Sequence, residues 1–262
     1  MSFLKGPDPL KLFLAKVEGR SKLNDEECDG ILGLPVTPRQ VQPHREIVRL
    51  GDTADHACIV ANGIVARFAQ VLNGARQIVS MHVAGDMVDL HSLMLPAAPA
   101  PLVALTSTTI LQIPHAALRD LVARFPGVGA ALWRECVIDG NIVAHWLVNV
   151  GRRDARARLA HLICELAVRS NQIGNFIEGR FPMPITQDQI ADALGLTSVH
   201  VNRMMQSLRG EGLLESSGRE TTVLDWQGLV RVGEFDPHYL HLSRAIAGLA
   251  LRHPAANALN SQ

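Results

Sequence analysis

The sequence predicts an α+β fold with a β-rich N-terminal half, one long helix and a C-terminal winged helix-turn-helix. Three observations support this prediction. Short apolar runs punctuated by Gly and Pro fill residues 35–115. Near residue 115 the hydrophobic period changes from that of strands to that of helices. Residues 186–224 then have the pattern of two short capped helices followed by a hairpin.

Several short strands are predicted between residues 35 and 115. Runs such as ACIVANGIVARFAQV and RQIVSMHVAGD are rich in β-branched residues and are bounded by turn formers. Asn73-Gly74 separates two of these runs and predicts a tight hairpin, because both residues tolerate a positive φ. Many short strands at even spacing predict a small barrel or sandwich.

A long helix follows a short one. HAALRDLVARF predicts the short helix, and PGVGAALWRECVIDGNIVAHWLVNVG predicts the long one. A long helix needs a partner on its apolar stripe, either its own domain or a second copy of the chain. We expect a dimer interface along this stripe. Its predicted residues are Leu132, Cys136, Val143, Trp146 and Val150.

The stretch TQDQIADALGLTSVHVNRMMQ predicts a helix-turn-helix. Thr186 and Gln189 have the spacing of a capping box before an apolar run. Gly195 suits the end of the first helix, where a positive φ is commonly required, and Thr197 can cap the second helix. The buried stripe of the second helix is predicted to be Val201, Met205 and Leu208.

The outward face of the second helix has no carboxylate, which favours an approach to phosphates. Its Arg and Asn side chains suit guanine and adenine edges. A hairpin predicted at residues 213–224 adds a wing with Arg219 at its tip. These features predict DNA binding, and a module that contacts only protein is the alternative. The predicted DNA-binding residues are Thr186, Thr197, Ser198, Val199, His200, Asn202, Arg203, Gln206 and Arg219.

Composition narrows the function classes. Basic and acidic residues number 25 each, which argues against a wholly electrostatic nucleic-acid binder. The four cysteines form no CxxC pair, so neither a disulfide framework nor a metal site is expected. No signal peptide and no long apolar run is evident, so we expect a cytoplasmic protein without a membrane span. GxSxG, HExxH and P-loop motifs are missing, so an enzyme is not expected.

The arrangement resembles the Crp/Fnr family, the cyclic-AMP receptor protein and fumarate–nitrate regulator family of bacterial transcription factors. ITQDQIADALGLTSVHVNRMMQSLRGEGLLE is its most specific segment, and NGARQIVSMHVAGD and ALTSTTILQIP resemble the family's β-roll. The resemblance covers about residues 20 to 230. It implies a homodimer on double-stranded DNA with a near-palindromic operator, and RNA polymerase as a further candidate partner.

The resemblance also implies four domains or segments. They are a cyclic-nucleotide-binding-like β-roll at 1–125, a dimerisation helix at 126–151, a winged helix-turn-helix at 152–232 and a C-terminal helical tail at 233–262.

The resemblance assigns roles on the second helix. Arg203 matches the Arg that binds a guanine, and Thr186 matches a phosphate contact. Thr197 and Gln206 also fall on contact positions. Val199 departs from the pattern, since many members carry Glu there to read a cytosine or a neighbouring base. Val can only touch a thymine methyl, so we predict an operator unlike the TGTGA-like or TTGAT-like half-sites of the family.

The sensor half departs from the cyclic-nucleotide members. Those members need a Gly-Glu pair for the ribose and an Arg-Ser pair for the cyclic phosphate. Here the pairs are Gly85-Asp86 and Ala98-Pro99, and no Lys or Arg occurs between Arg76 and Arg119. A buried phosphate without a cation is unfavourable, so binding of cyclic AMP is not expected.

Haem or redox sensing within the same family stays an alternative. GDMVDLHS resembles a stretch of the carbon-monoxide-sensing haem regulator, and His91 matches its haem-ligating His. Asp89 replaces the neighbouring Cys ligand, so His91 is either a haem ligand or a core histidine. Cys28 alone cannot replace an iron–sulfur motif, and Cys136 is either redox-active or a buried thiol. The candidate pocket residues are Gly85, Asp86 and His91.

Overall fold

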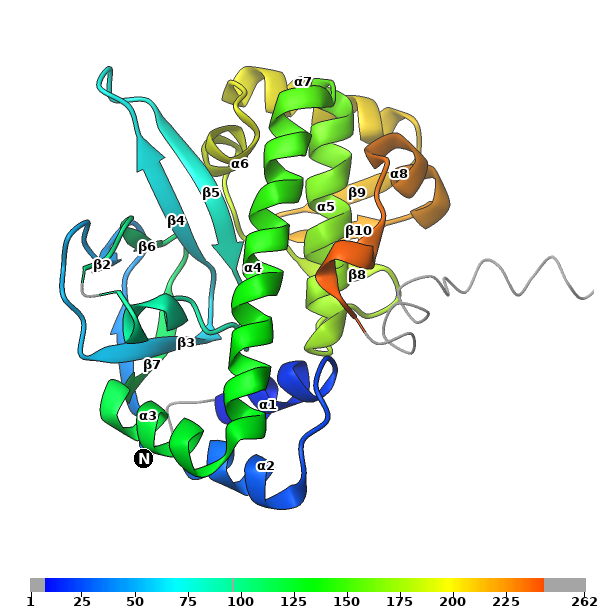
Figure 1. The fold of residues 1–262 in the computed structure, drawn as a ribbon. Coiled ribbons are helices and arrows are strands. Elements are labelled where there is room, and N and C mark those ends of the chain that lie inside the picture. Colours follow the sequence, from blue (N-terminus) through cyan, green and yellow to red (C-terminus); the bar gives the residue numbers. More distant parts are fainter. Residues whose placement is uncertain (1–7, 96, 243–262) are drawn as a thin grey trace, which may run out of the picture. The chain divides into compact units, whose positions relative to one another are not determined.

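The computed structural model describes residues 8–95 and 97–242. The chain divides into two compact units, Met1–Asn141 and Ile142–Gln262, which are described in turn. One long helix, α4 (Pro126–Arg152), belongs to both units (Figure 1). Among the described residues, no helix is long and apolar enough to cross a membrane.

Two antiparallel sheets form the β-rich part of the first unit and confirm the prediction of many short strands. Their orders are β1-β7-β3 and β2-β6-β4-β5. Buried side chains from both sheets share one core, which includes Val60, Val65 and Ile110. The strands are β1 (Thr37–Val41), β2 (Glu46–Val48), β3 (His56–Asn62), β4 (Val65–Gln70), β5 (Arg76–His82), β6 (Leu102–Ala104) and β7 (Thr108–Pro114).

The β4–β5 hairpin exists as predicted, but its turn differs from the prediction. Gln70 pairs with Arg76, so five residues form the loop instead of a two-residue turn. Gly74 takes a positive φ of 87°, whereas Asn73 does not. The Asn73 side chain instead accepts a hydrogen bond from the Ala75 amide at 3.0 Å. Its preference for turns therefore acts through the side chain and not through a left-handed backbone.

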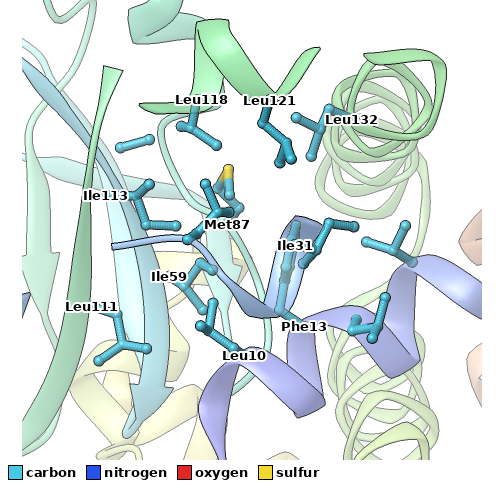
Figure 2. Packing of buried hydrophobic residues seen from close by; sticks show 14 of the residues in the cluster. Leu10, Phe13, Ile31, Ile59, Met87, Leu111, Ile113, Leu118, Leu121 and Leu132 are labelled. Carbon is cyan, nitrogen blue, oxygen red and sulfur yellow. The ribbon is translucent and has the colours of Figure 1, made fainter. Parts of the chain in front are cut away.

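Helices cover the β1-β7-β3 sheet in the first unit. Figure 2 shows their apolar side chains meeting those of β3 and β7, with Phe13, Ile31 and Leu118 among the buried residues. The Leu132 side chain of α4 enters the same cluster. The other helices of this unit are α1 (Pro9–Glu18), α2 (Asp25–Leu32), the 3-10 helix η1 (Leu90–Leu93) and α3 (His115–Arg124).

The second unit is built on α5 (Ala155–Gln172), whose long buried face packs against α7 and α8. The predicted hairpin is confirmed, because Ser217 pairs with Glu220 across the turn at Gly218. The elements that follow α5 are β8 (Arg180–Pro182), α6 (Gln187–Leu194), α7 (Ser198–Gly210), β9 (Leu214–Ser217), β10 (Glu220–Val223), α8 (Trp226–Gly233) and the 3-10 helix η2 (Pro237–Leu240).

The predicted C-terminal helical tail is only partly described. Residues 234–242 contain η2, a 3-10 helix of four residues. Residues 243–262, where most of the predicted tail helix falls, lie outside the described residues. The segment 234–242 packs on α4 and α5 within the second unit, through contacts of Tyr239.

Candidate functional site

The helix-turn-helix is fixed by local hydrogen bonds that the sequence predicted. Thr186 and Gln189 form the capping box, with side-chain-to-amide distances of 3.2 and 2.8 Å. Gly195 ends α6 in the left-handed region, with φ 63° and ψ 40°. Thr197 Oγ1 accepts a hydrogen bond from the His200 amide at 3.2 Å and caps α7. These caps set where each helix begins and ends, and so fix the connection between them.

The rotation of α7 about its own axis is set by its buried side chains. Val201, Met205 and Leu208 are buried, as predicted. They lie four and three residues apart, so they form a single stripe on one side of the helix. Ile190 and Leu194 of α6 are also buried. The opposite side of α7 therefore faces away from the core of the unit.

All nine residues predicted to bind DNA lie at or near the surface. Val199 has 79% of its surface exposed, which is high for an apolar side chain. One residue beside this face, Gln187, is not among those predicted. Its side-chain amide donates a hydrogen bond to Asn202 Oδ1 at 3.4 Å. The only sequence signal for Gln187 is its place directly after a helix cap. The exposed members are Thr186, Thr197, Val199, Asn202, Arg203, Gln206 and Arg219, and the half-buried ones are Ser198 and His200.

The charge on this face is positive or neutral along the whole of α7. No Asp or Glu lies within Ser198–Gly210, and Arg203 and Arg209 are both exposed. Glu211, the first acid after the helix, already pairs with Arg156 and accepts from Ser207 Oγ at 3.1 Å. The N-terminal end of α7 adds the partial positive charge of a helix terminus. The face can therefore approach an anionic polymer without a carboxylate in the way.

The wing is tied to the body of the unit at its tip. Gly218 takes a positive φ of 60° in the β9–β10 turn. The Arg219 carbonyl accepts a hydrogen bond from the Met183 amide at 2.8 Å, while its side chain stays exposed. Arg209 of α7 hydrogen-bonds Ser216 of β9, which holds the wing against α7. The tip therefore presents Arg219 from a fixed backbone.

Another hydrogen bond joins the start of α5 to α6. Asp154 caps α5, because its Oδ1 accepts a hydrogen bond from the Ala157 amide at 2.9 Å. Arg158 donates to the carbonyls of Arg153 at 2.8 Å and Leu194 at 3.0 Å. It thus joins the hinge, the two residues 153 and 154 between α4 and α5, to the end of α6. No sequence pattern indicates this role, since Arg158 is one of several arginines on α5.

The predicted interface on α4 is wrong at two of its five positions. Leu132 and Trp146 are only 5% and 6% exposed, and both are buried within their own units. Leu132 enters the cluster of Figure 2, and Trp146 Nε1 donates to Glu165 Oε2 at 2.9 Å. Cys136 and Val150 are half-buried, and Val143 is exposed. The spacing chosen from the sequence mainly marks the side of α4 that packs within the chain.

A second apolar stripe on α4 is exposed. Trp133 and Leu147 are 72% and 71% exposed, and Val137 and Val148 are about half exposed. Exposed small residues, Gly140, Ala144 and Gly151, continue the stripe. Positions 133, 137, 140, 144, 147 and 151 alternate steps of four and three, which is the spacing of a coiled-coil seam. The sequence contains this spacing too, but it does not show which of the two stripes on α4 is exposed.

Two of the three predicted pocket residues hold a helix in place instead of lining a cavity. Lys16 of α1 is buried, and its Nζ lies 2.6 Å from Asp86 Oδ1. Asp86 Oδ2 accepts from the Val83 amide at 2.7 Å. Gly85 has a φ of 83°, and a Cβ there would lie 3.3 Å from the Leu12 carbonyl oxygen. The Gly85-Asp86 pair is therefore engaged by α1, which the sequence could not show.

The third predicted pocket residue, His91, lines a small cavity beside η1. The cavity measures about 10 Å³ and is also lined by Asp52, Asp89 and Ser92. Asp89 is buried, its Oδ1 accepts from the Cys58 amide at 2.7 Å, and its Oδ2 has no hydrogen-bond partner among the described residues. Burial raises the pKa of Asp89 to about 6. Burial, with a smaller contribution from the Arg67 charge, lowers the pKa of His91.

These residues do not fit a cyclic nucleotide. The described lining of the cavity contains no Lys or Arg to pair with a phosphate. It instead presents the buried carboxyl of Asp89, which would repel one. The volume admits only a water-sized group. Across residues 8–95 and 97–242, no group of three or more His, Cys, Asp or Glu side chains is arranged to hold a metal ion.

Two family models match this chain. A cyclic nucleotide-binding domain matches residues 38–125, and a Crp-like helix-turn-helix domain matches residues 157–232. Each match lies within one of the two units, and together they include the cavity and the capped helix pair.

Known proteins with the same arrangement are similar over most of the chain. The transcriptional activator protein FnrA of Stutzerimonas stutzeri is 26% identical over 207 residues, which cover 79% of this chain and 84% of that protein. The structure of FixK2 from Bradyrhizobium japonicum has a TM-score of 0.69 at 24% identity, covering 76% of this chain and 98% of that one. A double mutant of CooA from Carboxydothermus hydrogenoformans has a TM-score of 0.59 at 18% identity, covering 76% and 88%. The structural matches show the fold.

Proposed function

The chain belongs to the Crp/Fnr family of transcription factors, which bind DNA through a helix-turn-helix, and we propose that it acts as a homodimer on a near-palindromic operator. The observation that carries the proposal is the outward face of α7. It is exposed, it lacks carboxylates, and its N-terminal end is fixed by the Thr197 cap. Such a face can enter the major groove without losing any contact that holds the unit together.

The side chains of α7 divide between reading bases and holding phosphates. Arg203 is central and exposed, and a guanidinium can form two hydrogen bonds to a guanine edge. Asn202 offers the pattern that suits adenine, and its contact with Gln187 would orient its amide. Thr186 and Arg219 lie at the edges of the face and suit phosphates, which position the protein but carry no sequence information.

The exposed seam on α4 supports the homodimer. Exposed apolar side chains at coiled-coil spacing are unfavourable in water unless a partner covers them. A second copy of the same helix is complementary, because an interface with two-fold symmetry uses the same surface on both subunits. Two α7 helices related by this axis would meet successive major grooves about 34 Å apart.

We propose that cyclic AMP is not the signal. The Gly85-Asp86 pair already holds Lys16, and the cavity beside η1 presents the Asp89 carboxyl. The cavity that His91 lines admits only a water-sized group and so does not fit a haem, which leaves redox sensing as the alternative within the same family. RNA polymerase is a further proposed partner, because the similar FnrA is named a transcriptional activator. A regulator that binds the chromosome would work in the cytoplasm.

The test is the affinity of the full chain for a selected operator, measured by fluorescence anisotropy at several salt concentrations. We expect the affinity to fall steeply with salt as counterions are released from the phosphates. Arg203→Ala should weaken specific binding by roughly 1–3 kcal/mol and relax the preference at one base in each half-site. The matched control is Arg231→Ala, which removes an exposed Arg on α8, away from α7. A protein-only module would show neither the salt dependence nor the loss.

A further inference from the structure

A buried carboxylate joins three elements of the second unit. Glu165 of α5 has no exposed surface. Its Oε2 accepts hydrogen bonds from Trp146 Nε1 of α4 at 2.9 Å and from the Tyr239 hydroxyl at 2.7 Å. Its Oε1 lies 3.1 Å from Arg169 Nη1. A buried charge with this many donors is well satisfied, and loss of any donor leaves it under-solvated.

Tyr239 contacts both of the helices that meet at the hinge. Besides its hydrogen bond to α5, its ring stacks on His145 of α4 with a centroid distance of 4.0 Å and an interplanar angle of 12°. The side chain is buried, and this burial together with the Glu165 charge raises the pKa of its hydroxyl, which therefore keeps its proton. Tyr239 lies in η2, beyond the winged helix-turn-helix itself.

Other contacts fix the segment that carries Tyr239. His161 of α5 donates from Nδ1 to the Gly233 carbonyl at 3.1 Å, and its Nε2 lies 3.3 Å from the Tyr239 hydroxyl. The end of α8 approaches α5 so closely that a Cβ at Gly233 would lie 2.7 Å from the His161 amide nitrogen. Phe235 packs edge-on against both His161 and Tyr239. Residues 234–240 are thus anchored by their buried side chains, Phe235, Tyr239 and Leu240.

We propose that residues 234–240 are a strap that sets the angle between the end of α4 and α5, with Tyr239 as a positioning residue for operator binding. The inference rests on the proposed function, in which α4 pairs the two copies and α7 reads DNA. Within the second unit, α7 packs on α5, and Arg158 ties α5 to the end of α6. The angle at the hinge therefore decides where each α7 lies relative to the dimer axis.

A strap of this kind should affect binding to DNA that carries two half-sites. It should hardly affect binding to DNA that carries one half-site. A single recognition helix can settle in one major groove whatever the hinge angle. Two helices of one dimer must match a fixed spacing, so the apparent affinity falls with the fraction of dimers that hold the right angle. A loosened hinge should also tolerate half-sites at other spacings. This pair of effects separates positioning from a general loss of stability.

The test compares the full chain with its Tyr239→Phe variant, which keeps the ring and removes the hydroxyl. Anisotropy is measured on the selected two-half-site operator, on operators with one base pair added or removed between the half-sites, and on DNA with one half-site. We expect the variant to bind the two-half-site operator about tenfold more weakly, the change that follows from one lost hydrogen bond to a buried charge. Binding to one half-site should change less than twofold, and discrimination between spacings should shrink.

Two further variants make the result decisive. The deciding quantity is the ratio of the affinity for the two-half-site operator to the affinity for DNA with one half-site. His145→Ala removes the stacking contact to α4 and leaves the Glu165 hydrogen bonds in place, so it should lower this ratio as Tyr239→Phe does. Leu229→Val is the control, because it loosens the buried packing of α8 but removes none of the hydrogen bonds or ring contacts of Tyr239, and it should leave the ratio unchanged. The inference is overturned if Tyr239→Phe keeps the wild-type ratio and spacing preference. If the wild-type chain itself shows no preference for two half-sites, the proposed function fails instead.

Discussion

Single side chains decide which DNA sequence and which signal this regulator can recognise. Val199 places an exposed apolar group at a position where we propose that α7 faces a base, and it cannot accept a hydrogen bond there as a carboxylate would. In the sensor half, the buried carboxyl of Asp89 lines a cavity whose described lining contains no Lys or Arg. The sequence showed Val199 and Asp89 as departures from family members, Asp89 as the replacement of a Cys ligand in the haem regulator. The pairing of Lys16 with Asp86 was not visible, because 70 residues separate the two side chains.

Val199→Glu should change the base preference at one position of each half-site. The added carboxylate can accept a hydrogen bond from cytosine but loses the contact with a thymine methyl, so affinity for the wild-type operator should fall by roughly 1–3 kcal/mol. Selection from random DNA with each variant measures the preference. Val199→Thr keeps one methyl group and should retain the wild-type consensus. An unchanged consensus for Val199→Glu would show that position 199 does not face a base.

Asp89 should make the stability of the first unit depend on pH. Its pKa in the folded chain is about 6, above the ordinary value of 3.8, so folding favours the protonated form. The free energy of unfolding should therefore fall as the pH rises from about 4 to about 6, by at most about 3 kcal/mol. Asp89→Asn should remove this dependence and keep the acceptor for the Cys58 amide. Urea unfolding at several pH values measures it.

The control for this titration is Asp52→Asn, because Asp52 lines the same cavity but is exposed. That variant should retain the pH dependence of the wild-type chain. Parallel pH curves for the wild-type chain and Asp89→Asn would contradict the assignment.

Whole elements show which parts of the fold the sequence could predict. The caps at Thr186 and Thr197, the left-handed Gly195 and the wing hairpin were predicted correctly, since they depend on residues a few positions apart. The exposed face of α4 was not predicted correctly, because the sequence of a long helix with two apolar stripes does not reveal which stripe its own unit covers. The choice depends on distant contacts such as that between Trp146 and Glu165. Exposure, not periodicity, identifies the seam.

Leu147→Asp should weaken the homodimer. The substitution places a charge in the middle of the exposed seam, where it would be buried against its counterpart in the second copy. We expect the dimer dissociation constant to rise by at least about tenfold, as for an interface residue with a substantial role. Analytical ultracentrifugation measures it. Leu224→Asp adds the same charge at another exposed Leu, outside α4, and should leave the dimer intact. Equal effects of both substitutions would contradict an interface on the seam.

At the scale of the whole molecule, the sensor half, for which we propose a signal other than cyclic AMP, is joined to the DNA-reading half through α4 and the short hinge that follows it. A signal at the first unit would act by changing the population of hinge angles in the dimer. The fold class and the helix-turn-helix could be predicted from the sequence because their patterns are local and periodic. The strap at residues 234–240 could not, since it lies beyond the recognisable motif and depends on the buried Glu165.

The most direct test of the central claim is selection of bound sequences from random double-stranded DNA by the full chain, at moderate salt. We expect a consensus with two-fold symmetry and half-sites about one helical turn apart, with a guanine in each half-site that Arg203 can contact. A consensus without two-fold symmetry, or no enrichment over random sequence, would contradict a homodimer that reads DNA through α7.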